Sequence, residues 1–525
     1  MGSAVPPAET AWLLRRVVGF TDLDQADIAA ILEQATSLAE GVLAPLDRAG
    51  DVIGAKWDAG VVTMPPGYDA AFRAYADAGW IGIAADTAFG GQGLPEVIAL
   101  AAFEPVSSAN MGFGLCPLLT QDAIKVLSVH GTADQQARLL RPMIEGRCTG
   151  TMCLTEPQSG SDLSGVRTKA MPLADGTYAI SGQKIYITYG EHQLTENILH
   201  LVLARLPDAP DGSAGISLFA VPKRRADGQA NNVACLSIEH KLGIHASPTC
   251  VIGFDGAIGE LVGPKHRGLA CMFAMMNAAR LGVAMQGVAV AERAFRRATA
   301  FANNRIQGGA AIIEHPDVRR MLLTMRALAL GGRLLTLYAA NCAEPRASLL
   351  IPIAKSWCTD AGVEAASLGV QVHGGMGFIE ETGAAQHLRD ARITPIYEGT
   401  NGIQAITLLR RGLLRDQGIA VAALLDEIRD DAPILAAAVE TARIAADHMR
   451  QAEARAAEAG ASAFLQILGT LTSGWLCAKL LAEADAPPAA RSAAAIFLDQ
   501  ILPRVSFHAA TLRTTPALLG HGEIT

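Results

Sequence analysis

The sequence predicts an α+β protein of several domains: an N-terminal all-α domain, a middle β-barrel, a C-terminal helical bundle and an additional C-terminal helical domain. Three observations support this prediction. Apolar residues recur at helical spacing up to about residue 150, short strand-like runs replace them from Thr151 to Gly263, and helical spacing returns after Lys265. We therefore expect domains at residues 1–150, 151–264, 265–418 and 419–525.

The N-terminal region shows clear helix signals. Asp22 and Asp24 precede a run with apolar residues at Ile28, Leu32 and Ala35, which predicts a capped helix. The break at 65–67, Pro-Pro-Gly, precedes a second helix expected over 68–78. The first domain is therefore mostly helical.

The middle region consists of short apolar runs separated by turn residues. Strand-length runs at this spacing favour a compact β domain, most simply a barrel. The runs lie at 178–180, 184–188, 199–203 and 216–221.

Helical periodicity then continues from Lys265 to about Leu414. Residues 421–525 form an alanine-rich block, interrupted at Gly460 and at 487–488, Pro-Pro. This block predicts the additional helical domain.

Composition excludes several classes of protein. The 525 residues are half apolar, with a mean hydropathy of +0.26, but no apolar run reaches the roughly 18 residues of a membrane span. Residues 1–16 contain no signal-peptide core, so we expect a cytoplasmic protein with no membrane span. A net charge of −8 gives no reason to expect nucleic acid as a partner. The nine cysteines lack metal-type spacing, so we expect core thiols and no metal site.

One stretch, Ile393 to Gln404, places a single carboxylate, Glu398, ahead of a helix. Pro395 and the β-branched residues before it predict an extended segment, and Thr400 is a good N-cap for the helix that follows. Gly399 would allow a ligand to approach the backbone. On spacing alone, an acidic residue just ahead of a helix is usually only a dipole or capping partner, and that interpretation is favoured for Glu398.

This stretch, with its Tyr-Glu-Gly-Thr run, resembles the catalytic-base motif of the FAD-dependent acyl-CoA dehydrogenases, and the resemblance extends from about Pro65 to Leu414. It implies that Glu398 removes the proton α to the carbonyl of an acyl-CoA thioester while the β-hydride passes to flavin N5, giving a trans-2-enoyl-CoA. An α-proton is weakly acidic, so the base must be desolvated beside the substrate, where burial raises its pKa.

Two further stretches resemble the flavin-binding segments of that family. The run 152–162, which contains Leu154, Thr155 and Ser161, resembles the turn that holds the isoalloxazine ring. The run 182–188 resembles the second flavin strand, although Tyr186 stands where most members have Trp. The resemblance implies that Leu154, Thr155, Ser161, Tyr186 and Thr188 bind FAD.

The resemblance also implies a subunit interface. Arg305, Gln371 and Gly375 match residues that reach the flavin of a neighbouring subunit, so the chain is expected to form a homo-oligomer, a dimer at least. Thr400 completes the expected cofactor contacts.

The acyl-CoA substrate is expected to contact four residues: Ser161, Asn277, Arg280 and Gly399. Some relatives place the base just before the arginine, where this chain has Ala279, so Glu398 has no rival there.

The resemblance leaves alternatives open. An electron-transfer flavoprotein is the expected electron acceptor, but an acyl-CoA oxidase using O₂ would share the first half-reaction. The C-terminal block resembles the branch that includes methylmercaptopropionyl-CoA dehydrogenases. A flavin-bearing, nucleic-acid-binding stress protein of the same fold is a third reading. The 12 acidic and eight basic residues of 421–525 argue against it.

Overall fold

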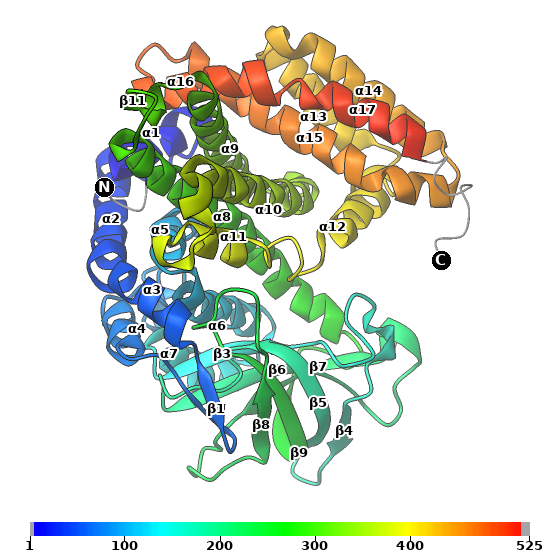
Figure 1. Ribbon diagram of the computed structural model, residues 1–525. Coiled ribbons are helices and arrows are strands. Elements are labelled where there is room, and N and C mark those ends of the chain that lie inside the picture. Colours follow the sequence, from blue (N-terminus) through cyan, green and yellow to red (C-terminus); the bar gives the residue numbers. More distant parts are fainter. Residues whose placement is uncertain (1–4, 516–525) are drawn as a thin grey trace, which may run out of the picture. The chain divides into compact units, whose positions relative to one another are not determined.

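A computed structural model describes residues 5–515, which divide into two compact units. We call Leu38–Pro95 with Asn110–Ala279 the sheet unit, and Met1–Ser37, Glu96–Ala109 and Arg280–Thr525 the helical unit. Along the chain, helices precede the sheet and helices follow it (Figure 1), so the predicted order of helical, sheet and helical regions is confirmed.

The sheet unit contains the helices α3 (Ala44–Ile53), α4 (Tyr68–Asp77), α6 (Met111–His130) and α7 (Ala133–Ile144), and a hairpin of β1 (Lys56–Asp58) and β2 (Val61–Thr63). The helix expected at 68–78 is confirmed as α4. Asn110 caps α6 by accepting from the N–H of Phe113, and Thr132 and Gln135 form a capping box on α7.

Seven strands form the main sheet: β3 (Cys148–Cys153), β4 (Lys169–Pro172), β5 (Tyr178–Thr188), β6 (Asn197–Arg205), β7 (Ile216–Pro222), β8 (Val233–Ile238) and β9 (Thr249–Val262). Their order is β3-β6-β4-β5-β9-β7, β8 pairs with β9, and β6 also pairs with β7. β4 meets β6 at one residue pair, Lys169 with Arg205. The compact β region is confirmed as a sheet whose strands pair back on one another; a closed barrel remains a prediction.

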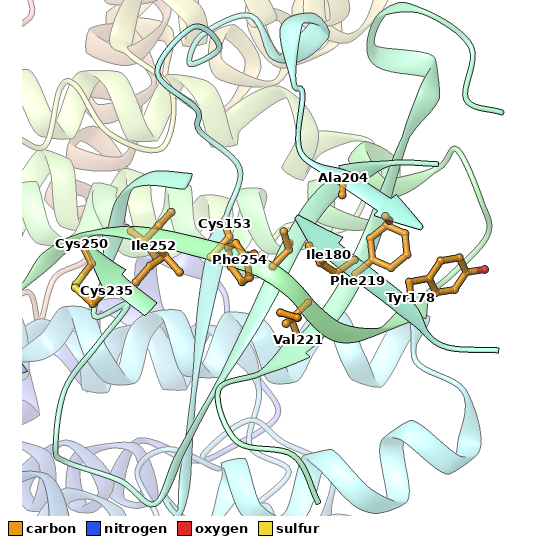
Figure 2. Close-up of a cluster of buried hydrophobic side chains, with 14 of the residues drawn as sticks. Cys153, Tyr178, Ile180, Ala204, Phe219, Val221, Cys235, Cys250, Ile252 and Phe254 are labelled. Carbon is orange, nitrogen blue, oxygen red and sulfur yellow. The ribbon is translucent and has the colours of Figure 1, made fainter. Parts of the chain in front are cut away.

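A continuous apolar core fills the inside of this sheet (Figure 2). Phe219 and Tyr178 meet edge to face with ring centroids 5.0 Å apart, and Ile180 and Phe254 are fully or almost fully buried. Cys153, Cys235 and Cys250 belong to the same core, and all nine cysteines are free thiols, as expected.

The helical unit contains α1 (Pro7–Leu13), α2 (Gln25–Leu38), α5 (Glu96–Ala109), α9 (Pro316–Asn341), α10 (Arg346–His373), α11 (Ala384–Ala391), α12 (Asn401–Thr407) and most of α8 (Gly268–Asn304). The short strands β10 (Ile306–Gln307) and β11 (Ala310–Ala311) form a hairpin. The buried guanidinium of Arg333 links α9 to α5 and α8. It lies 2.6 Å from Glu104 of α5 and 3.1 Å from Glu292 of α8.

Five more helices follow: α13 (Ile419–Asp431), α14 (Ala436–Gln451), α15 (Ala454–Ala482), α16 (Pro488–Ile496) and α17 (Arg504–Thr514). We call residues 419–515 the C-terminal helices. α15 lies against α14 and α17 (Figure 1) and also packs on α9, α10 and α12. α8 and α15 are long and apolar enough to cross a membrane by length and composition, but 78% of the apolar window of α15 is buried within the protein, as in a core helix.

Candidate active site

Glu398 lies in the loop between α11 and α12, which we call the base loop (392–400; yellow in Figure 1). The extended segment predicted before it is wrong. The backbone forms consecutive turns instead, in which the N–H groups of Thr394, Ile396 and Tyr397 donate to carbonyls three or four residues back. The residues continue the coiling of α11 because these local bonds satisfy backbone groups that a strand partner would otherwise have to satisfy.

The N-cap prediction is confirmed. Thr400 accepts a hydrogen bond from the N–H of Ile403 at 3.3 Å, and α12 begins at the next residue. The base loop therefore ends where a helix N-terminus begins.

The backbone of Glu398 is strained. Its φ is +55°, in the left-handed region that a residue with a Cβ seldom adopts, and Gly399 follows at +85°. Such strain costs of order 1–3 kcal/mol and persists only where surrounding contacts hold it. No described residue accepts from the N–H of Glu398, so this donor is available beside its own carboxylate.

Polar contacts hold the strained pair of peptides on several sides. Gln404 donates to the carbonyls of Glu398 and Gly399 at 3.1 and 3.2 Å. Arg280 donates to the Glu398 carbonyl at 3.4 Å, and the hydroxyl of Tyr397 donates to Gln286. These contacts position the carboxylate without neutralising it.

The surroundings of Glu398 shift the pKa of its carboxyl group upward. Burial raises the pKa of this carboxyl group to about 7, against the opposing effect of the cationic side chains of Arg280 and Lys355. A carboxylate with this pKa can take a proton from substrate near neutral pH, and a capping carboxylate needs no such shift. Thr400, and not Glu398, supplies the side-chain N-cap of α12.

The predicted substrate residues fall in two places. Arg280 is buried on α8 beside the base loop, where burial lowers the pKa of its guanidinium, and Gly399 lies in the loop itself. Asn277 is half-buried three residues earlier on α8 and Ser161 is exposed in the sheet unit. Arg280, Gly399 and Glu398 are thus brought together within one unit.

The predicted ring-binding residues gather at β5 and the turn after β3. Thr155 is joined to β5 because its carbonyl accepts from the N–H of Ile185 at 2.9 Å. Tyr186 lies in a bulge of β5 with φ +60° and is 60% exposed, and Thr188 ends the strand half-buried. An open aromatic face beside hydroxyl side chains suits the face and polar edge of a flavin ring, so these residues fit that part of FAD.

A buried ion pair supports the same turn. The ammonium of Lys184 lies 2.8 Å from Glu156 and also donates to the carbonyl of Leu154 at 2.9 Å. Burial raises the pKa of Glu156, but Lys184, Thr168 and the N–H of Arg167 outweigh it and lower the value to about 2. The turn after β3 is therefore held by a buried ion pair, in which burial lowers the pKa of the Lys184 ammonium and the Glu156 carboxylate opposes that effect.

The residues expected at the pyrophosphate lie on the surface of the helical unit. Arg305, Gln371 and Gly375 are exposed, and open space surrounds the position of a Cβ at Gly374 and Gly375. Exposed glycine backbone and an arginine suit a phosphate group.

Sequence reasoning missed the partners of the base loop. Lys355 of α10 donates to the carbonyl of Gly399 at 2.9 Å, and Gln404 and Gln286 provide other contacts. The sequence gives one local indication that Lys355 is buried, namely its position directly after the apolar run 349–354. No spacing rule connects it with a loop more than 40 residues later.

Three family models match the chain in succession: the N-terminal domain of acyl-CoA dehydrogenase over residues 26–147, the middle domain over 151–257 and the C-terminal domain over 266–413. Together they cover both the sheet strands and the base loop.

Known proteins agree with these matches. The chain is 47% identical over 516 residues to the 3-methylmercaptopropionyl-CoA dehydrogenase of Ruegeria pomeroyi, covering 89% of this chain and 87% of that protein. A chain in the structure of the electron transferring flavoprotein of Acidaminococcus fermentans is 29% identical, with a TM-score of 0.67 over 76% of this chain and 99% of that one.

The fold likeness also includes the C-terminal helices. The structure of Caenorhabditis elegans ACDH-11 in complex with C11-CoA has a TM-score of 0.82 at 21% identity, over 100% of this chain and 96% of that one. The matched domains and the 47% identity show that the chain belongs to the acyl-CoA dehydrogenase family, as its sequence motifs indicated, and is an FAD-dependent enzyme that dehydrogenates an acyl-CoA thioester.

Proposed function

We propose that Glu398 is the base that removes the α-proton of the acyl-CoA thioester. The observation that supports this most directly is the strained, half-buried carboxylate whose pKa burial raises to about 7. With a pKa of about 7, roughly half of the carboxyl groups are ionised at pH 7, and the ionised form is basic enough to accept a proton.

The remaining roles divide between the chain and the cofactor. FAD, when bound, supplies the two-electron acceptor for the β-hydride. The N–H of Glu398 is suited to donate to the thioester carbonyl, where charge develops as the α-proton leaves. Arg280 keeps a positive charge beside the loop, which favours the ionised form of Glu398 before the proton transfer.

Several finer roles belong to the same proposal. The flavin ring is bound by Leu154, Thr155, Ser161, Tyr186 and Thr188. The other FAD contacts are Arg305, Gln371, Gly375 and Thr400. The acyl-CoA substrate is bound by Ser161, Asn277, Arg280 and Gly399. The seven-stranded main sheet forms a closed barrel in this proposal. The domains are 1–150, 151–264, 265–418 and an additional domain at 419–525, and the protein is cytoplasmic.

We infer a homo-oligomer and an electron-transfer flavoprotein as partners. Met376, Phe378 and Ile379 are 50%, 85% and 46% exposed directly after Gly375, and an apolar surface next to a phosphate-binding loop suits a subunit interface. The similarity to a chain in an electron transferring flavoprotein structure supports that acceptor.

The first substrate to test is a short thioether acyl-CoA, 3-methylmercaptopropionyl-CoA, because the relative from Ruegeria pomeroyi is a dehydrogenase named for that compound. An anaerobic panel of straight, branched and thioether acyl-CoAs, followed by flavin bleaching, would rank the acyl groups.

The test of the base is Glu398→Gln, which keeps the volume and removes the proton acceptor. Because general-base catalysis contributes about 10²–10⁴-fold, single-turnover flavin reduction should fall at least about 10²-fold while FAD content and acyl-CoA binding persist. Reduction at close to the wild-type rate would place the base elsewhere.

A further inference from the structure

Lys355 is a fully buried lysine that directly contacts the base loop. It lies on α10 after an apolar run, and its side chain has 0% exposure. Its ammonium lies 2.9 Å from the carbonyl of Gly399 and 3.0 Å from Oδ1 of Asn401. Within residues 5–515, both close partners are neutral oxygens, which is unusual for a buried ammonium.

These two contacts lie on either side of the helix start that follows Glu398. Gly399 is the next residue after the base, and Asn401 is the first residue of α12. Asn401 in turn donates to Asp360 at 2.8 Å, so its side chain is held from both ends. Lys355 therefore restrains the peptide that sets the direction of the strained Glu398 backbone.

Charge links Lys355 to Glu398 as well. Three charged groups act on the ammonium: Glu398 of the base loop, Asp360 of α10 and Arg280 of α8. Burial lowers the pKa of Lys355 to about 7, while the two carboxylates oppose that effect. Burial likewise brings the pKa of Glu398 to about 7, so the two groups titrate in one range and each favours the charged form of the other.

We propose that Lys355 is a positioning residue for the dehydrogenation: its ammonium anchors the Gly399 carbonyl and adds, beside Arg280, a second buried positive charge that favours the ionised form of Glu398 before it accepts the α-proton. Lys355 does not contact the substrate in this role; it acts through Glu398, and the inference therefore rests on the proposed function of that residue.

The role predicts a dependence on pH that a purely structural lysine would lack. Below about pH 7 the ammonium is charged and favours ionised Glu398, whereas well above that pH the neutral amine provides only the hydrogen bond. In wild type, the rate of flavin reduction should rise with pH as Glu398 ionises. In Lys355→Met, the midpoint of this rise should move to a higher pH by about one pH unit. The rate at pH 6 should then fall about tenfold relative to wild type, and the deficit should shrink toward pH 9.

Lys355→Gln separates the two parts of the role. A glutamine amide keeps a donor for the Gly399 carbonyl without the charge. We expect Lys355→Gln to reduce flavin at close to the wild-type rate at pH 9, and to show the same shift of the pH midpoint as Lys355→Met. Lys479→Met, a partly exposed lysine of α15 paired with Asp431, removes a positive charge remote from these contacts and should leave the profile unchanged.

The measurement is single-turnover anaerobic flavin reduction by a good acyl-CoA from pH 5.5 to 9.5, with FAD content and circular dichroism recorded for each variant. A rate lowered by the same factor at every pH, or a wild-type profile, would overturn the proposal. Loss of folded protein in both Lys355 variants would also overturn it, since Lys355 would then be a requirement for folding. Glu398→Gln, measured alongside, separates the two ideas. If it retains activity, the proposed base is wrong; if it is inactive and Lys355→Met is normal, only the role of Lys355 is wrong.

Discussion

Among residues 5–515, two lysines, one in each unit, are completely buried, and each supports a loop that carries predicted site residues. Lys184 of the sheet unit holds the turn after β3 through the Leu154 carbonyl, and Lys355 of the helical unit holds the base loop through the Gly399 carbonyl. They differ in their second partner. Lys184 is paired with the Glu156 carboxylate at 2.8 Å, whereas Lys355 meets the neutral side chain of Asn401.

This difference concerns how strongly the charge of each lysine is fixed by its direct partners. The Glu156 carboxylate, with its pKa lowered to about 2, stays ionised near neutral pH, and its contact with Lys184 at 2.8 Å opposes the lowering of the Lys184 pKa by burial. Within the described part of the chain, Lys355 has no carboxylate among its hydrogen-bond partners, and the carboxylates that favour its charge are Asp360 and Glu398, the proposed base. In the proposed role, Lys355 is coupled to the reaction through Glu398, whereas Lys184 is paired with a carboxylate outside the base loop.

The largest effect on stability is expected for Lys184→Met. The substitution leaves the Glu156 carboxylate buried without its cation, which costs about 3–5 kcal/mol of unfolding free energy. Urea unfolding at pH 7 would measure the loss. Lys184→Met combined with Glu156→Gln should recover a large part of it, and no recovery would mean that packing rather than charge is responsible.

Glu398→Gln should change stability in the opposite direction. Because the folded pKa of Glu398 is raised from 4.5 to about 7, the folded state binds more protons between these values, and stability falls as pH rises through that window. At pH 8 the wild type therefore carries a penalty that Gln lacks. The variant should be more stable by about 1–3 kcal/mol at pH 8 and nearly equal to wild type at pH 4. Urea titrations of matched apoproteins at both pH values would check this, and equal stabilities at pH 8 would contradict the raised pKa.

Lys355→Met should cost less stability than Lys184→Met. The groups left behind, a carbonyl and an amide oxygen, are neutral, so the loss is about 1–2 kcal/mol. Urea unfolding of both single variants at one pH compares them directly. A loss for Lys355→Met as large as that for Lys184→Met would remove the distinction between the two lysines.

The smallest effect concerns the C-terminal helices. Gln466 of α15 donates to Asp360 at 2.7 Å, and Asp360 accepts from Asn401, so a chain of hydrogen bonds connects α15 to the partner of Lys355. Gln466→Ala should lower the flavin reduction rate by about two- to threefold, with a cost near 0.5 kcal/mol. Thr441→Ala, an exposed site on α14, is a control that should change neither value. A tenfold loss for Gln466→Ala would make the C-terminal helices a direct part of the catalytic support.

Four features could be predicted from the amino-acid sequence: the order of helical and sheet regions, the helix α4, the N-cap at Thr400 and Glu398 as the candidate base. These depend on local patterns: apolar spacing, capping side chains and a contiguous motif. The turns before Glu398 were decided by the continuation of α11, which overrode the β preference of Ile393 and Thr394.

The groups that surround the Glu398 carboxylate could not be predicted from the sequence, because they are brought together by packing. Arg280, Lys355 and Glu398 lie on three segments of the chain, separated by more than 40 residues, and meet because α8, α10 and the base loop belong to one packed unit. A pKa near 7 and a strained backbone arise from that packing, since desolvation and the field of neighbouring charges depend on distances in space rather than on spacing in sequence.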